Sequence, residues 1–478
     1  MTVSDPPLTH LPPGPKDPAI RQTLGFAAGP YEFLSRCHRE YGDYFTLQMI
    51  RQPPTVWIAD AEAIRAIFAL PRDAFRNTSD DVSLVLGNRS VLFMDGDEHR
   101  RERQMLMPAF HGERMRLYGE TIRDAARDGL ARWSREEPVA LHSELQRVTL
   151  RVICKCVFGV DDGPNMDRLQ PLLTAFLESS FTPALNLASL FVEPKRIRKY
   201  IEKRGELDAD TSWFGRLKAR TLPLQEVANL RAEVDRVLFD EIARCRREGP
   251  ENRNDILAMV ASARAEEDGR GLTDEELRDE LLTLLIAGHE TTATMAAWAV
   301  HHVIRAPRVQ QRLVAELDTA FPDGVVRPEM VGKLDYLKAV INETLRLSPV
   351  AIAVGRRLLR PATLGRYTFP TDTYLLAGIY LLHRSSEHWE RPDEFEPERF
   401  LGGEPSPYKF LPFGGGVRRC VGLEFARYQL RIVLAQLFRG ATLAPIEGQD
   451  PRPAMRGVLV GLTEAPVRVG DRGQVDAA

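Results

Sequence analysis

The sequence has few cysteines, no long apolar run and almost no net charge. Five cysteines are scattered over 478 residues (Cys37, Cys154, Cys156, Cys245 and Cys420). This sparse, odd-numbered set argues against a disulfide framework and for a reducing compartment. A net charge of −3 gives no electrostatic reason to expect nucleic acid as a partner. No stretch approaches the about 18 consecutive apolar residues of a membrane span. We therefore expect a cytoplasmic protein without a membrane anchor, beginning with a polar, proline-rich tail at residues 1–15.

Helical patterns dominate the chain. Residues 44–50 and 55–58 are short β-prone runs separated by Arg-Gln-Pro-Pro, which predicts one hairpin, and residues 76–93 are expected to form a long loop. The longest helical pattern is Asp274–Arg305. A capping box at Thr273–Glu276 starts it and Ala306–Pro307 ends it. At 1.5 Å per residue this helix would be roughly 48 Å long, enough to cross the molecule.

The run Phe413–Gly422 combines three consecutive glycines with a single cysteine, Cys420. Such a run is neither helix nor strand and predicts a turn with unusual backbone angles or a close approach to another group. Val421–Gln436 looks helical, which would place Cys420 at a helix N-terminus, where a thiolate is stabilised. The alternative is a glycine-rich loop with an incidental buried cysteine.

Two further polar patterns stand out on predicted helices. In the long helix, Ala287–Thr292 places a glycine, a carboxylate and two threonines in an apolar stretch, and Thr291 could bond the carbonyl of Ala287 and open the helix. A tolerated polar patch facing a groove is the alternative. Earlier in the chain, His99 and Arg103 share one helix face, and from the residues alone a solvated charged face is the favoured interpretation.

The spacing Phe413-x-x-Gly416-x-Arg418-x-Cys420-x-Gly422 resembles the heme-binding signature of the cytochrome P450 family. Further motifs that resemble those of the family occur in the expected order from Gly96 onward, so the resemblance covers most of the chain. It implies a single domain over residues 1–478, mainly α with small β-sheets. The implied shape is a triangular prism crossed by a long central helix. The implied cofactor is heme b, with Cys420 as the iron ligand.

The resemblance also implies roles for individual residues. Donors to the heme propionates would be His99, Arg103, Arg356 and Arg418, and other cofactor contacts would be Ala287, Gly288, Phe413, Gly416 and Gly422. Glu290 and Thr291 would relay protons to bound dioxygen, and Glu343, Arg346 and Arg399 would form a buried structural network. The substrate-pocket candidates are Leu285, Ala287, Ile352, Ala353, Val354 and Leu459.

The activity implied is monooxygenation of a hydrophobic small molecule by a monomer. The motif style resembles bacterial fatty-acid-hydroxylase-like members, and fatty acids, terpenoids and polyketide-like products all suit the aliphatic pocket candidates. A separate ferredoxin or flavodoxin with its reductase would supply electrons. The basic face on which an acidic donor could dock would be formed by Arg418, Arg419, Arg427 and Arg431. The alternative is that Arg418 is buried and the other three are ordinary helix charges. The alternatives are a peroxygenase, an oxidative coupling or rearrangement enzyme, and a non-enzymatic heme sensor or ligand carrier.

Overall fold

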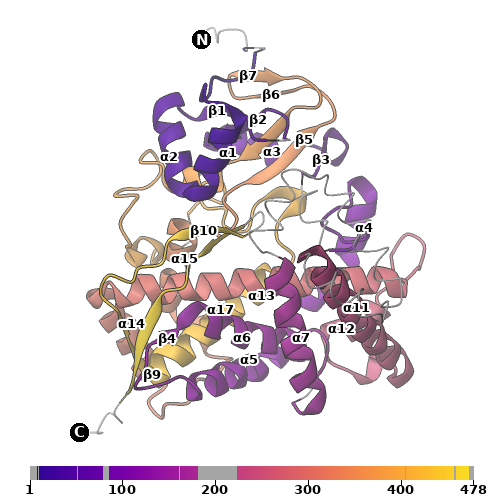
Figure 1. Ribbon diagram of the computed structural model, residues 1–478, viewed down its shortest axis with the longest axis vertical. Coiled ribbons are helices and arrows are strands. Elements are labelled where there is room, and N and C mark those ends of the chain that lie inside the picture. The colour runs from indigo at the N-terminus through magenta and orange to yellow at the C-terminus, as the bar shows by residue number, and fades with distance from the viewer. Residues whose placement is uncertain are drawn as a thin grey trace. The chain divides into compact units, whose positions relative to one another are not determined.

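The structure is a computed structural model that describes residues 8, 10–50, 52–78, 86–112, 114–160, 162–180, 223–403, 405–456 and 459–472 (Figure 1). The chain packs into two compact units. Unit 1 comprises Met1–Thr78, Ile122–Leu145 and Thr291–Ala478, and unit 2 comprises Ser79–Thr121 and Gln146–Glu290. Helical residues far outnumber strand residues, which confirms the predicted fold class. The single domain stays a prediction.

The main sheet of unit 1 is mixed, with five strands in the order β1-β2-β8-β5-β3. The predicted hairpin is present: β1 (Tyr44–Leu47) pairs with β2 (Thr55–Ile58) in antiparallel register, although β1 ends at Leu47 rather than Ile50. Next to β2 lies β8 (Tyr374–Ala377), in parallel, and it pairs in turn with β5 (Val354–Leu358). The edge strand is β3 (Phe75–Arg76).

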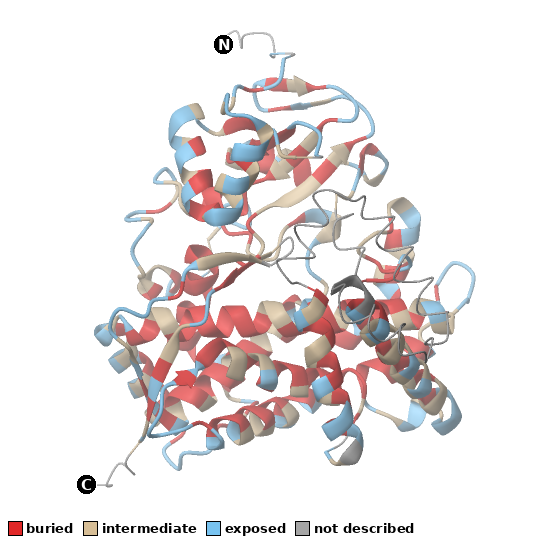
Figure 2. Cartoon of the chain, viewed as in Figure 1, coloured by how far each residue is buried: buried red, intermediate tan, exposed pale blue. Residues whose placement is uncertain are grey.

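Strands β1 and β2 are buried on both faces of the sheet (Figure 2). Since side chains alternate along a strand, Val56 and Ile58 join one apolar cluster with helix α3 (Ala61–Phe68). Trp57 points the other way and joins a second cluster with helix α2 (Pro30–Tyr41). Helix α3 begins at Asp60, whose carboxylate accepts a hydrogen bond from the Ala63 amide at 2.6 Å.

The rest of unit 1 consists of short strands, of one further helix near the N-terminus and of helices in the C-terminal half. The smaller sheets are formed by β4 (Val139–Ala140) with β12 (Pro466–Asp471) and β9 (Ala441–Pro445), by β10 (Pro453–Arg456) with β11 (Leu459–Leu462), and by β6 (Ala362–Leu364) with β7 (Tyr367–Phe369). The helices are α1 (Ala19–Ala28), α14 (Pro307–Ala320), α15 (Asp335–Leu347), α16 (Ile379–His383) and α17 (Leu423–Gly440). Single turns of 3₁₀ helix occur at Arg72–Ala74, Val331–Lys333, Pro397–Phe400 and Gly416–Arg418.

The regular secondary structure in the described part of unit 2 is entirely helical. Its helices are α4 (Gly96–Leu106), α7 (Pro164–Ser180), α11 (Pro223–Glu248) and α12 (Ile256–Ser262), with 3₁₀ turns at Met107–Phe110 and Pro250–Asn252. Helices α5 (Arg114–Ala131), α6 (Leu141–Cys156) and α13 (Asp274–Ile304) run through the boundary between the units. Of the loop predicted at residues 76–93, residues 86–93 are irregular as expected and residues 79–85 lie outside the described residues.

Helix α13 is the long helix that the sequence predicts, and it ends one residue earlier than expected. Its capping box is formed as predicted: the Thr273 amide donates to Glu276 Oε2 at 2.8 Å and the Glu276 amide donates to Thr273 Oγ1 at 3.2 Å. Pro307 then opens α14 at its first position. The helix is continuous through Ala287–Thr292, so opening of the helix by Thr291 stays a prediction.

Candidate active site

The turn that carries Cys420 is closed by its own backbone. The Gly414 amide donates to the Leu411 carbonyl at 2.9 Å, and the Cys420 amide donates back to the Phe413 carbonyl at 3.0 Å. Gly416–Arg418 makes one 3₁₀ turn between them. The loop thus returns on itself and ends at the cysteine.

Cys420 is the one exposed cysteine among the five. The other four are buried, and burial raises the pKa of the Cys37 thiol to about 11 and that of Cys154 to about 12. Burial also raises the pKa of Cys156 and of Cys245. Since the thiolate is the form that binds metal, these four are core residues and Cys420 is the accessible thiol. The alternative of an incidental buried cysteine is therefore wrong.

The backbone conformation and packing of the protein require glycine at two positions of the turn. Gly414 and Gly416 have φ of +67° and +66°, a region that favours glycine. A Cβ added at Gly416 would lie 2.5 Å from the carbonyl oxygen of Phe68, the last residue of α3. Gly416 therefore permits a close approach to backbone, whereas the sequence suggested a close approach to a flat cofactor. Phe68 is a supporting residue that sequence reasoning missed.

Cys420 lies outside the helix that follows it. Helix α17 begins at Leu423 and its N-cap is Gly422, so the cysteine precedes the cap by two residues. The prediction that the helix begins at Val421 and ends at Gln436 was wrong at both ends, because Val421–Gly422 form a turn and the helical pattern continues to Gly440.

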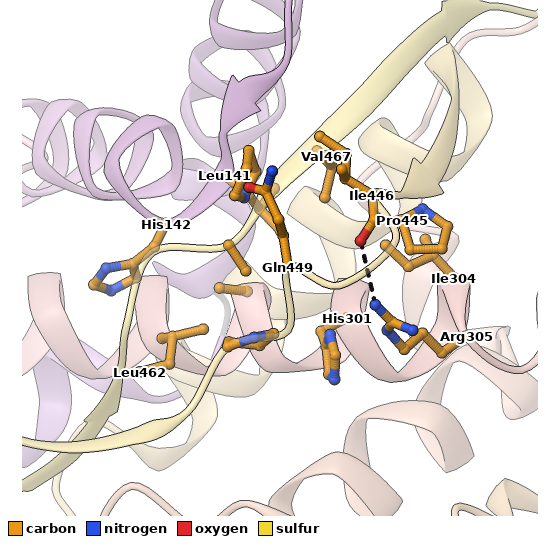
Figure 3. Close-up of a pocket in the computed structure, with 14 residues that line it drawn as sticks. Leu141, His142, His301, Ile304, Arg305, Pro445, Ile446, Gln449, Leu462 and Val467 are labelled. Atoms are coloured by element: carbon orange, nitrogen blue, oxygen red, sulfur yellow. Dashed lines mark hydrogen bonds between the residues drawn. The ribbon is translucent and has the colours of Figure 1, made fainter.

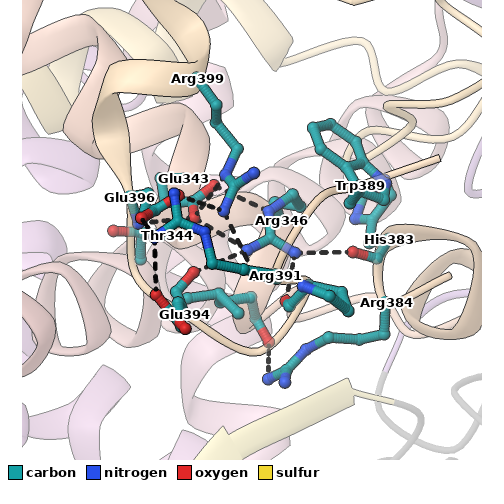
Figure 4. Close-up of polar contacts among 12 residues, drawn as sticks. Glu343, Thr344, Arg346, His383, Arg384, Trp389, Arg391, Glu394, Glu396 and Arg399 are labelled. Carbon is teal, nitrogen blue, oxygen red and sulfur yellow. Dashed lines mark hydrogen bonds and ion pairs between the residues drawn. The ribbon is translucent and has the colours of Figure 1, made fainter. Parts of the chain in front are cut away.

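Glu343, Arg346 and Arg399 form the predicted network in unit 1 (Figure 4). Glu343 and Arg346, fully buried on α15, make a two-pronged pair, with both N–O distances at 2.8 Å. Arg399 Nε donates to Glu343 Oε1 at 3.0 Å. Arg346 also donates to the carbonyls of His383, Pro392 and Glu394 at 2.8, 2.6 and 3.1 Å. The network therefore ties α15 to the segment that precedes the cysteine turn.

The two adjacent arginines of β5 have different environments. Arg356 is 1% exposed, donates to the Gly355 carbonyl at 2.8 Å and lies over the rings of Phe75 and Phe68. Arg357 forms a surface ion pair with Asp372 at 2.9 Å. Arg356 is thus the interior cation, as expected for a residue that meets a cofactor carboxylate, and Arg357 is a surface residue.

Helix α4 places His99 and Arg103 one turn apart in unit 2. His99 is buried and Arg103 is half-buried. The alternative of a fully solvated charged face is therefore wrong for this pair. Both side chains can donate hydrogen bonds to carboxylates.

A cluster of buried carboxyl groups lies beside them in unit 2. Glu280 of α13 accepts from the Val91 amide at 2.5 Å, and Asp279 accepts from the Arg89 amide at 2.8 Å. Burial raises the pKa of Glu102 to about 7, and the charge of Glu276 adds to this effect. Burial, together with Glu102 and Asp279, raises the pKa of Glu280 well above its usual range. Sequence reasoning did not single out this cluster, since each residue resembles an ordinary helix charge.

Helix α13 leaves one face open at its centre. Ala287 is exposed and Leu284, Gly288 and Thr291 are half-buried, although their neighbours Leu285 and Ala293 are fully buried. Positions 284, 287, 288 and 291 follow the spacing of a single helix face. A mostly apolar, mostly buried helix therefore presents small and hydroxyl side chains along this face.

Side chains of α6 hold the neighbouring part of α13. Gln146 Nε2 donates to Glu290 Oε2 at 2.5 Å, and Thr149 Oγ1 bonds His289 Nδ1 at 2.9 Å. A Cβ added at Gly288 would lie 2.8 Å from Ile153 Cδ1. Sequence reasoning missed Gln146 and Thr149, because nothing local in α6 links them to residues about 140 positions away.

The predicted substrate-pocket residues fall into two groups. Ala353, Val354 and Leu459 are half-buried, and Ala287 is exposed. Leu285 and Ile352 are buried at 0% and 4% exposure, and Ile352 belongs to the apolar cluster around Trp57. The first group is partly accessible and the second group belongs to the core, and a role in a substrate pocket stays a prediction for both groups.

Unit 1 also contains an open depression of about 330 Å³, open solvent included, which α13 lines with Ala297, His301 and Ile304 (Figure 3). Its wall includes His142, His301, Arg305, Ile446 and Val467. It contains none of the predicted site residues. Arg305 in this wall donates to the Ile446 carbonyl at 3.5 Å.

The donor set fits an iron porphyrin with two carboxylates. An exposed thiol at Cys420 suits iron, and cationic or imidazole donors on separate elements suit the carboxylates. In unit 1 these donors are Arg356 and Arg418. A mainly helical fold and this donor set are the features expected of a heme-thiolate protein.

Comparison with known proteins agrees. The family described as cytochrome P450 matches residues 12–470. Cytochrome P450 135B1 of Mycobacterium tuberculosis is 32% identical over 452 residues, which cover 94% of this chain and 89% of that protein. Cytochrome P450 138 of the same organism is 32% identical over 456 residues, which cover 95% and 94%. The solved structure of retinoic-acid-bound cyanobacterial CYP120A1 superposes with a TM-score of 0.79 at 22% identity, covering 97% of this chain and 100% of that one.

The chain belongs to the cytochrome P450 family, as its turn at Cys420 predicts. It is therefore a heme-dependent monooxygenase in the general sense. Among the residues that the structure describes, no helix is both long and apolar enough to cross a membrane.

Proposed function

We propose that the protein inserts one atom of dioxygen into a hydrophobic small molecule, using electrons from a separate redox protein. The observation that carries this proposal is the open face of α13, where Ala287, Gly288 and Thr291 are exposed or half-buried on a mostly buried helix. Small side chains leave room for a flat cofactor and for dioxygen, and the hydroxyl of Thr291 can donate a hydrogen bond there.

Heme b, when bound, would supply dioxygen activation, for which an axial thiolate is suited. Cys420 would be the iron ligand. Arg356, Arg418, His99 and Arg103 would hold the two propionates, the arginines through charge-assisted hydrogen bonds. Phe413 and the backbone of Gly416 and Gly422 would contact the cofactor beside Cys420, and Ala287 and Gly288 would also contact it.

Glu290 and Thr291 would control protons. The Glu290 carboxylate accepts a hydrogen bond from Gln146 Nε2 at 2.5 Å, which orients it for a water-linked path. Thr291 would pass the proton on through its hydroxyl. General acid catalysis of this kind contributes about 10²–10⁴-fold to a rate.

The substrate side would be aliphatic. Ala353, Val354 and Leu459 are half-buried and uncharged, which favours a fatty acid, a terpenoid or a polyketide-like product. Leu285 and Ile352 would support these residues from the core. A screen of these three compound classes for a substrate-induced spin-state shift of the heme would identify the class that binds.

The electron donor would be a ferredoxin or a flavodoxin with its reductase. Arg419 is exposed near the cysteine, while Arg427 lies over the Phe413 ring at 5.4 Å. Arg419 is thus better placed than Arg427 to meet an acidic donor. Turnover that requires both dioxygen and this donor would separate a monooxygenase from a peroxygenase, a coupling enzyme or a heme sensor.

The relay is tested with a substrate found in the screen. Thr291→Ala should keep the heme but reduce product per electron consumed by about tenfold or more, with release of peroxide, because a relay group is lost. Thr291→Ser, which keeps the hydroxyl, is the matched control and should stay near the wild-type ratio. Unchanged coupling in Thr291→Ala would remove Thr291 from the relay.

A further inference from the structure

His383 occupies an unusual place for an imidazole. It is the last residue of α16, is 0% exposed, and its Nε2 lies 2.8 Å from the backbone nitrogen of Leu411. A backbone N–H can only donate, so Nε2 must accept and carry no proton. Burial, together with the charge of Arg346, lowers the pKa of His383 to about 3, against a smaller opposing effect of the Leu345 and Arg346 carbonyls. The ring is therefore neutral at ordinary pH.

The same residue is anchored to the buried network. Its carbonyl accepts from Arg346 Nη1 at 2.8 Å, and its ring packs against Phe410 with centroids 5.3 Å apart. Phe410 in turn packs against Phe400 at 5.0 Å, next to Arg399 of the network. His383 thus holds two consecutive residues of the chain, Phe410 by packing and Leu411 by a hydrogen bond.

Leu411 begins the turn that carries the cysteine. Its carbonyl accepts from the Gly414 amide, and the carbonyl of Phe413, between them, accepts from the Cys420 amide. The hydrogen bond from the Leu411 amide to His383 Nε2 therefore fixes the position of the first residue of the turn. A change at Leu411 would move Phe413, and with it the backbone bond that orients Cys420.

We propose that His383 is a positioning residue for the Cys420 thiolate, acting as a neutral acceptor that locks Leu411 at the start of the turn. The inference rests on the proposed role of Cys420 as the iron ligand. His383 would thus affect the bond between the Cys420 thiolate and iron although its own imidazole is not an iron ligand. This effect would come in addition to the contribution of His383 to the stability of the fold.

The chain offers a matched control. His302 is a half-buried imidazole of unit 1, its pKa is lowered to about 3 by desolvation, and its Nε2 bonds Ser348 Oγ at 3.0 Å. It stacks on Phe395 at 4.9 Å and has no described bond to the cysteine turn. His302→Leu should lower stability much as His383→Leu does, without touching the thiolate.

The experiment uses the full-length holoenzyme and the red-shifted Soret band of its reduced carbonyl complex, which reports the thiolate. His383→Leu should lose this band about tenfold faster than wild type in mild denaturant, since a buried N–H is left without an acceptor. At a denaturant concentration at which the helical circular dichroism is retained, His302→Leu should lose it at the wild-type rate. His383→Gln, whose Oε1 can replace Nε2, should also stay near wild type, whereas the shorter His383→Asn should resemble His383→Leu.

Equal rates in His383→Leu and His302→Leu would overturn the proposal, as would equal rates in the Gln and Asn variants. The second comparison decides the question if His383→Leu does not fold. Absence of the red-shifted band in the wild-type enzyme would instead contradict the proposed ligand role of Cys420.

Discussion

The sharpest stability prediction concerns Glu343, because its carboxylate is fully buried and accepts four hydrogen bonds. The donors are Nε and Nη2 of Arg346, Nε of Arg399 and the backbone nitrogen of Glu396, all within 3.0 Å. Glu343→Gln keeps the shape but removes the charge. Breaking a buried pair leaves a buried cation uncompensated, at a cost of about 3–5 kcal/mol. That is a large part of the about 5–15 kcal/mol that holds a typical protein folded.

A control with the same sequence spacing is available on the surface. Glu62 and Arg65 of α3 are also three apart, with 3.2 Å between Oε2 and Nε, but their side chains are 77% and 57% exposed. Glu62→Gln should cost about 0.2–1 kcal/mol, as exposed pairs do.

Both free-energy costs are measured by denaturant unfolding of the holoenzyme. Each cost is taken from the shift of the unfolding midpoint, with the slope of unfolding free energy against denaturant concentration unchanged. The reasoning is refuted if Glu343→Gln costs no more than Glu62→Gln. The double variant Glu343→Leu with Arg346→Met should cost at least about 2 kcal/mol less than the sum of the two single changes, since neither buried charge is then left alone.

Two predictions concern the thiol and the carboxyl cluster. Cys420→Ala should abolish the red-shifted Soret band of the reduced carbonyl complex, and survival of the band would place the iron ligand elsewhere. Glu102 has a pKa of about 7 in the folded protein and an ordinary value of 4.5, so the folded state binds the extra proton between these values. The stability that Glu102 contributes should therefore be fully present below about pH 4.5 and be lost, by up to about 3 kcal/mol, as pH rises through 7. Glu102→Gln should flatten this slope in denaturation measured from pH 5 to 8, and an unchanged slope would contradict the assignment.

Features encoded in neighbouring residues were predictable from the sequence. The ends of α13 are marked by a capping box and a proline, so its bounds were predicted to within one residue. The pairing of Glu343 with Arg346 follows from their spacing on one helix. The glycine turn was predictable because its φ angles exclude most other residues.

Features that depend on distant parts of the chain were not predictable in this way. Phe68 is an apolar residue at the end of an ordinary helix, and only the fold brings its carbonyl against Gly416. Gln146 and Glu290 are likewise far apart in sequence, and their bond depends on how α6 packs along α13. The start of α17 depends on a local turn at Val421–Gly422, which a helical pattern alone does not reveal.

Two buried residues support the cysteine turn, and the three glycines of the turn explain why it needs this support. Three consecutive glycines have many unfolded conformations to lose, so the turn costs more to order than a turn of other residues. Phe68 blocks one side of the turn through backbone contact with Gly416, and His383 holds its start at Leu411. Both supports come from buried residues of unit 1. Because an iron–sulfur bond tolerates little displacement, a flexible turn can present its thiolate only if a rigid core fixes it at more than one point.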